Sequence, residues 1–129
     1  MQVKTDTKEK IHVITVGEPS LSADMAAELS DLLAPYLQND VKNIILNLKE
    51  LQYVDEAAGE MLVKTQQKFY ENNASFVICE MQKPVEEFLD SVNLLEMINN
   101  TPTESEASDI VQMEEIEREL MDDDPLSSA

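Results

Sequence analysis

The chain has little cationic charge for its size, and this scarcity excludes several classes of ligand. Its 129 residues include 27 Asp and Glu but only nine Lys and Arg, for a net charge of −18 at pH 7. Nucleic acids and anionic membrane surfaces are bound by clusters of Lys and Arg, which this sequence does not contain. The acidity either steers a basic protein partner toward the surface or serves only to keep the protein soluble.

Cysteine, glycine and long apolar runs are scarce as well. Cys79 is the only cysteine, so an intramolecular disulfide is excluded and a reducing compartment is expected. No apolar run approaches the roughly 18 residues of a membrane span, and the N-terminus lacks the apolar core of a signal peptide. We therefore expect a cytoplasmic protein. With only two glycines and five prolines, the chain has few turn residues and should be rich in helix.

What the chain does contain is an alternation of strand and helix patterns. Strand-forming runs occupy positions 3–6, 11–16, 43–48 and 75–79, and a charged turn between the first two predicts a hairpin. Apolar residues at helical spacing predict helices over 25–37, 58–70, 84–92 and 103–120, the first of them kinked or tightened at Pro35. The apolar segment 94–98 could form an edge strand. This order predicts a single α/β domain with a parallel or mixed sheet.

One stretch combines a buried strand with a helix start. The apolar run 43–48 is followed by a short polar connection that delivers Asp55, a favoured N-cap residue, to a helix that runs to Tyr70. Free backbone N–H groups and the helix dipole favour an anion at such a position. The turn from Asp55 to Gly59 is therefore the first place to look for a functional site.

The C-terminal part of the chain carries half of the net charge. Residues 104–124 contain ten acids and one base, Arg118, for a net charge of −9. Thr103 and Glu106 have the spacing of a capping box at the start of the last helix. We assign residues 1–115 to the folded domain and residues 116–129 to an acidic helical extension and tail. These acids lack the spacing and the glycine of a calcium loop, so we expect no metal site.

Three segments together resemble the STAS domain family, which includes bacterial anti-sigma factor antagonists and the cytoplasmic tails of sulfate transporters. They are NIILNLKELQYVDEAAG, EMLVKTQQKFYENNASFVICEM and FLDSVNLLEMINNTPTESEAS, and the resemblance extends over residues 1 to about 115. It implies a STAS-like α/β fold, with a mixed sheet of four to five strands and four helices, and no catalytic activity of its own. In the antagonists, an Asp-Ser-(Ser/Thr)-Gly turn at the start of the second helix docks on an anti-sigma factor that is also a kinase. Phosphorylation of that serine breaks the complex.

The resemblance places the family's Asp on Asp55, but the phosphoacceptor position holds Glu56 and the next hydroxyl position holds Ala57. The family's glycine falls on Ala58, and its Gly-x-Leu-Asp loop has become residues 17–20, GEPS. This implies a docking module that cannot be phosphorylated here, with Glu56 either a permanent phosphomimetic charge or simply a good first-turn helix residue. The predicted partner is an anti-sigma kinase-like ATPase, and the predicted partner-binding residues are Ser20, Leu21, Asp55, Glu56, Ala57, Ala58, Gly59 and Met61.

Three alternative functions compete with this prediction. The chain could be a STAS accessory subunit of a permease or ABC transport complex. An enzyme that uses Asp55 and Glu56 as an acid/base pair is disfavoured, because adjacent residues at a helix start point apart. Nucleotide binding has no glycine-rich loop or lysine motif to support it. We therefore expect no catalytic residue, no metal and no cofactor.

Overall fold

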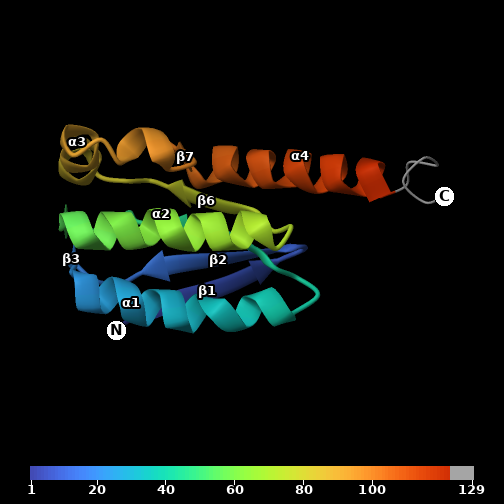
Figure 1. Cartoon of the computed structure of the whole chain (residues 1–129), viewed down its shortest axis with the longest axis horizontal. Coiled ribbons are helices and arrows are strands. Elements are labelled where there is room, and N and C mark those ends of the chain that lie inside the picture. The colour runs from blue at the N-terminus through green and yellow to red at the C-terminus, as the bar shows by residue number, and fades with distance from the viewer. Residues whose placement is uncertain (123–129) are drawn as a thin grey trace.

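The computed structural model describes residues 1–122, which form alternating strands and helices (Figure 1). In chain order the elements are β1 (Val3–Lys8), β2 (Ile11–Val16), β3 (Ser20–Leu21), α1 (Ala23–Leu33), the 3-10 helix η1 (Ala34–Gln38), β4 (Asn43–Asn47), β5 (Tyr53–Val54), α2 (Glu56–Glu71), β6 (Phe76–Cys79), α3 (Lys83–Ser91), the 3-10 helix η2 (Leu95–Met97), β7 (Asn100–Thr101) and α4 (Glu104–Asp122). The predicted N-terminal hairpin is present, and the tightening expected at Pro35 is the change from α1 to η1.

Five strands form one mixed sheet in the order β1-β2-β4-β6-β7, while β3 and β5 form a separate parallel pair. Only the β1–β2 contact of the large sheet is antiparallel. Parallel neighbours require crossover connections, which the intervening helices supply. The central strands β4 and β6 are buried at every position, as their nearly continuous apolar sequences predicted.

The two faces of the sheet carry two separate apolar cores. Alternate residues of a strand point to opposite faces. Ile44 of β4 belongs to the larger core, which includes Phe69 of α2 together with side chains of α1 and α3. Its neighbour Ile45 belongs to the smaller core, in which Ala107 and Val111 of α4 pack. Thus α1, α2 and α3 cover one face, and α4 covers the other.

The prediction of an edge strand at 94–98 is wrong. That segment is the 3-10 helix η2 with its flanking residues, and the edge strand of the sheet is β7, which pairs with β6. Asn93 has a positive φ of 63° and turns the chain at the end of α3, where the N–H of Leu94 bonds the carbonyl of Leu89. The N–H groups of Met97 and Ile98 then bond carbonyls three residues back. These local bonds occupy the donors that a sheet ladder would need.

The C-terminal helix α4 runs without a break from Glu104 to Asp122, across the predicted boundary between residues 115 and 116. The division into a domain and a helical extension at that boundary stays a prediction. Thr103 caps it, accepting a hydrogen bond from the N–H of Glu106 at 3.2 Å, as the capping-box spacing predicted. The predicted tail at 123–129 lies outside the described residues. Among the helices of residues 1–122, none is both long and apolar enough to span a membrane.

Candidate functional site

Asp55 sets the geometry of the predicted docking turn. Its backbone is extended, and its carboxylate accepts a hydrogen bond from the backbone N–H of Ala58 at 2.7 Å. This is the N-cap expected from the sequence, and it satisfies one of the free N–H groups at the start of α2. The Asp55 carboxylate is therefore engaged in capping, and the first turn of α2 exposes Glu56 and Ala57 to solvent.

The small β3–β5 sheet places a second loop beside this turn. Ser20 lies opposite Tyr53 in parallel register. The carbonyl of Pro19 accepts a hydrogen bond from the N–H of Tyr53 at 3.0 Å, and the carbonyl of Leu21 accepts one from the N–H of Asp55 at 3.3 Å. These bonds bring together the two loops that carry the predicted binding residues.

The eight predicted residues differ in how far a partner could reach them. Glu56 and Ala57 are exposed, Ser20, Asp55 and Met61 are half-buried, and Leu21, Ala58 and Gly59 are buried. A Cβ on Gly59 would lie 2.8 Å from the side chains of both Leu89 and Leu94, so its missing side chain allows α2 to pack closely against this part of the chain. The buried three thus position the turn, whereas the other five have side-chain atoms within reach of a partner. The binding role of all eight stays a prediction.

Two aromatic residues that sequence reasoning missed extend this surface. Tyr53 is 60% exposed, and its ring centroid lies 6.5 Å from that of Phe88 on α3. Phe88 is half-buried against the larger core, whereas Tyr53 is exposed. Exposed aromatic residues are typical anchors of protein interfaces. No sequence pattern identified Tyr53, because a strand of two residues is too short to show alternation and the burial of Val54 is known only from the structure. We call the surface formed by Ser20, Tyr53, Glu56, Ala57 and Phe88 the docking face.

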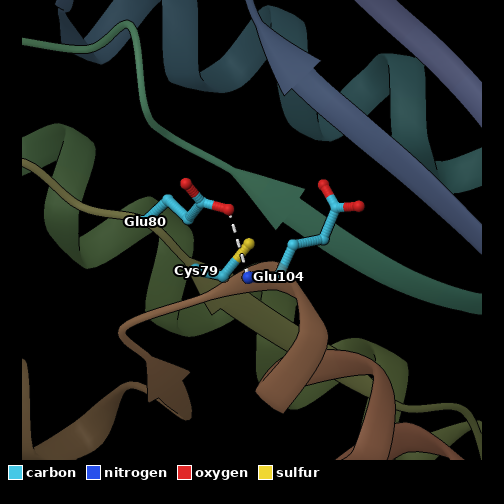
Figure 2. Close-up of side chains that lie close together, drawn as sticks. All are labelled: Cys79, Glu80 and Glu104. Atoms are coloured by element: carbon cyan, nitrogen blue, oxygen red, sulfur yellow. Dashed lines mark hydrogen bonds between the residues drawn. The ribbon is translucent and has the colours of Figure 1, made fainter.

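One group of side chains in the described part of the chain brings metal-ligating atoms together: the thiol of Cys79 and the carboxylates of Glu80 and Glu104 lie within 4.8 Å of one another (Figure 2). The Glu80 carboxylate accepts a hydrogen bond from the N–H of Glu104 at the start of α4, and Glu104 accepts one from the amide of Asn47. Burial, reinforced by the two carboxylates, raises the pKa of Cys79 to about 12. The thiol is therefore protonated at neutral pH and is a poor nucleophile. The observed contacts join the ends of β4 and β6 to α4.

Comparisons with known proteins agree on one fold family. The model of the STAS domain matches residues 2–107. An anti-sigma factor antagonist from Mycobacterium paratuberculosis superposes with a TM-score of 0.73 at 13% identity, covering 86% of this chain and 93% of that chain. A search of curated protein sequences gives no match.

Two further solved structures share the fold. The Bacillus anti-sigma factor antagonist SpoIIAA in its unphosphorylated form has a TM-score of 0.67 at 16% identity, covering 86% of this chain and 96% of that chain. A murine anion transporter, Solute Carrier 26 family member A9, has a TM-score of 0.70 at 13% identity, covering 84% of this chain but only 18% of the transporter. Identities this low establish a common fold alone.

Proposed function

The chain belongs to the STAS domain family, and on that premise we propose that it is a protein-interaction module of the anti-sigma factor antagonist type. STAS domains are in general non-catalytic interaction modules. In this proposal the docking face binds an anti-sigma kinase-like ATPase in the cytoplasm and so takes part in transcription regulation. The module has no catalytic activity and no cofactor, and Glu56 stands where the antagonists carry their phosphorylated serine.

The observation that carries the proposal is the construction of the first turn of α2. Because the Asp55 carboxylate caps the helix, it holds the turn in one conformation and leaves Glu56 and Ala57 facing solvent. The β3–β5 pair adds Ser20 and the exposed ring of Tyr53 to the same surface. A rigid turn flanked by an exposed aromatic residue suits a docking surface, since less conformational entropy is lost on binding.

Glu56 gives this surface a charge that no kinase or phosphatase can change at that position. A phosphoserine carries a charge of about −1.5 to −2 at pH 7, whereas a glutamate carries one negative charge permanently. A negative charge in the first turn also stabilises α2 through the helix dipole. Glu56 therefore serves either as part of a fixed interface or only as a helix-start residue, and the two roles are separable by experiment.

Binding measurements with charge-reversal variants test the docking face. Tagged wild-type protein, the variant Glu56→Lys and the variant Glu71→Lys are used to capture partners from a lysate of the native host, with and without ATP. The captured ATPase is then titrated calorimetrically. Glu71 is an exposed residue at the other end of the same helix and makes the same charge change. We expect Glu56→Lys to weaken binding by about tenfold or more, about 1.4 kcal/mol, and Glu71→Lys to leave it unchanged. Equal affinities for all three proteins would refute the docking face.

A serine placed at the acceptor position tests the fixed-interface role. The variant Glu56→Ser is incubated with the captured kinase and ATP, and phosphate incorporation is followed by mass spectrometry. We expect phosphorylation of the variant at this residue, followed by release of the complex, whereas the wild-type complex persists in ATP. Release of the wild-type complex by ATP would show that its interface is not fixed.

A second candidate function is that of an accessory subunit in a membrane transport complex. It is favoured by the structural match to one segment of an anion transporter. The same tagged proteins can be applied to detergent-solubilised membranes of the host. Capture of permease or ABC subunits, lost in Glu56→Lys and kept in Glu71→Lys, would support this function in place of the first.

A further inference from the structure

α4 changes character along its length. Its first half is held to the sheet by Ala107 and Val111, which are buried in the smaller apolar core. Beyond them the apolar residues continue at Met113, Ile116 and Leu120, as a helical spacing analysis expects. At 100° per residue, however, Ile116 lies about 180° around the helix from Ala107. The second half of α4 therefore directs its apolar residues away from the sheet.

Polar side chains hold this second half in place instead. Glu114 accepts hydrogen bonds from the hydroxyls of Ser75, at 2.6 Å, and Tyr70, at 2.9 Å. The guanidinium of Arg118 donates to Asn43 at 3.0 Å and to Ser75 at 3.1 Å. Tyr70 lies on α2, Asn43 is the first residue of β4, and Ser75 directly precedes β6. Hydrogen bonds to these three residues fix which side of α4 faces the sheet.

The result is an apolar stripe on the outer side of α4, formed by Met113, Ile116 and Leu120, which we call the α4 stripe. These side chains are 61%, 56% and 67% exposed. A hollow of about 310 Å³ adjoins the stripe at Ile116, and Ile11 and Val111 contribute to its lining. The α4 stripe lies beyond residue 107, where the match to the family model ends. It is also far from the docking face: the start of α2 and the last turns of α4 are at opposite ends of the molecule (Figure 1).

The charge around the stripe selects among its possible occupants. Residues 104–122 contain eight acids and a single base, Arg118, which pairs with Glu115 at 2.9 Å. Exposed Asp109 and Glu117 lie beside the stripe residues in sequence, and Glu119 pairs with Lys10, which also lines the hollow, at 2.8 Å. The acids around the stripe still outnumber the two bases. A second copy packed through the same stripe would bring these like charges together, which is unfavourable. An apolar face with lysine or arginine on its flanks complements both the stripe and its borders.

We infer that the α4 stripe is a second interaction surface, which binds an amphipathic helix of a partner protein whose apolar face is flanked by Lys and Arg. The helix lies along α4, with its apolar side chains on Met113, Ile116 and Leu120 and one of them in the adjoining hollow. Its basic side chains face the acids of α4. This is a helix-in-groove mode of recognition, in which apolar contacts supply affinity and charge supplies orientation.

A designed peptide tests this surface directly, whatever the sequence of the natural partner. The probe is a fluorescein-labelled peptide of leucine and lysine, about 14 residues or four helical turns long, with leucines at helical spacing. A scrambled peptide of the same composition has the same charge but no apolar face. Affinities are measured by fluorescence anisotropy for the full-length wild-type protein and for the triple variant Met113→Gln, Ile116→Gln, Leu120→Gln. A matched control variant, Leu32→Gln, Met97→Gln, removes exposed apolar residues that lie outside both the stripe and the docking face.

We expect the patterned peptide to bind the wild type and the matched variant alike, and the α4-stripe variant about tenfold more weakly or worse. Equal binding to the stripe variant, or equal binding of the scrambled peptide, would overturn the proposal, since charge alone would then explain the affinity. If the stripe variant does not fold, the wild-type protein is titrated with the patterned peptide and followed by NMR. The proposal requires the chemical-shift changes to centre on residues 110–120, and changes centred elsewhere would overturn it. Sedimentation velocity adds a further decisive outcome, because a wild-type dimer that the stripe variant abolishes would make a second copy the occupant and refute the basic helix.

Discussion

The two long helices α2 and α4 lie on opposite faces of the same sheet but are attached to it by different chemistry. α2 buries apolar or small residues along its whole length, from Ala58 through Leu62 to Phe69. α4 buries apolar side chains only in its first half, at Ala107 and Val111, and uses hydrogen bonds of Glu114 and Arg118 in its second half. Both helices are nevertheless amphipathic in sequence.

This difference shows that an apolar stripe on a helix does not by itself reveal which face packs. Burial of an apolar side chain is favourable wherever an apolar surface is available. On the α4 side, the sheet offers Asn43 and Ser75 where the second half of the helix lies, and these polar groups need hydrogen-bond partners once they are buried. Glu114 and Arg118 satisfy them, and the apolar residues of the same turns are left facing solvent.

Truncating an apolar side chain should destabilise the protein far more on α2 than on the second half of α4, and this is the largest difference that we expect between the two helices. Phe69 is 1% exposed and packs with its ring centroid 5.3 Å from that of Phe76. We expect Phe69→Ala to lower the free energy of unfolding by about 3–5 kcal/mol, because it leaves a cavity in the larger core. Ile116→Ala on α4 should change it by less than about 0.5 kcal/mol. Urea denaturation followed by circular dichroism measures both. A large loss in Ile116→Ala would mean that the stripe is packed in solution.

Removing a polar anchor of α4 should have the next largest effect. The Asn43 side chain is buried; it donates to Glu115 and accepts from Arg118 and from the backbone N–H of Ser75. We expect Asn43→Ala to cost about 1–3 kcal/mol, since it leaves buried groups without partners. The control is Asn72→Ala, which should cost much less because its exposed amide donates, within the described residues, to the carbonyl of Lys68 one helical turn earlier. Equal losses in the two variants would argue against the polar attachment of α4.

The tight packing of α2 can be tested at its glycine. An added methyl on Gly59 meets Leu89 and Leu94, both buried, at 2.8 Å. Overpacking of this kind costs about 1–3 kcal/mol, which exceeds the roughly 1 kcal/mol that alanine gains over glycine inside a helix. We expect a net loss of about 1 kcal/mol for Gly59→Ala. Gly17→Ala, where the added Cβ finds its nearest neighbour at 3.4 Å, should be close to neutral. Thermal unfolding of the two variants measures the difference. A Gly59→Ala variant that is more stable than the wild type would show that Leu89 and Leu94 move aside without loss of packing energy.

Acid should weaken the polar attachment of α4 by a smaller amount. The hydrogen bond from Asn43, together with the nearby charge of Arg118, lowers the pKa of Glu115 below its usual value of 4.5. A carboxylate with a lowered folded-state pKa stabilises the protein above pH 4.5, and this contribution is lost as the pH falls through the folded-state pKa. The free energy of unfolding should therefore decline below pH 4.5 more steeply in the wild type than in Glu115→Gln. Glu117→Gln, which changes an exposed neighbour, is the control, and parallel profiles for all three proteins would contradict the prediction.

Much of the fold could be predicted from local patterns, and the exceptions have physical causes. The continuous apolar runs of β4 and β6 identified the buried centre of the sheet, because only strands covered on both faces tolerate such sequences. The segment 94–98 was misassigned because its apolar residues satisfy strand and 3-10 patterns equally well. The positive φ at Asn93 and the bonds of the following turn decided in favour of the latter. At the candidate site, the aromatic extension through Tyr53 and Phe88 was missed because it joins residues of different elements.

The sequence by itself determined the alternation of elements and the N-cap at Asp55. These features depend on residue type and on neighbours within one helical turn, so a short stretch of sequence is enough to recognise them. Only the tertiary structure decided that Leu21 is buried while Tyr53 is exposed, and that α4 faces the sheet with Arg118 instead of Ile116. Those outcomes depend on contacts such as Arg118 with Asn43, which are 75 residues apart. Which of two faces a helix buries is settled by the surface it meets, and that surface is assembled from distant parts of the chain.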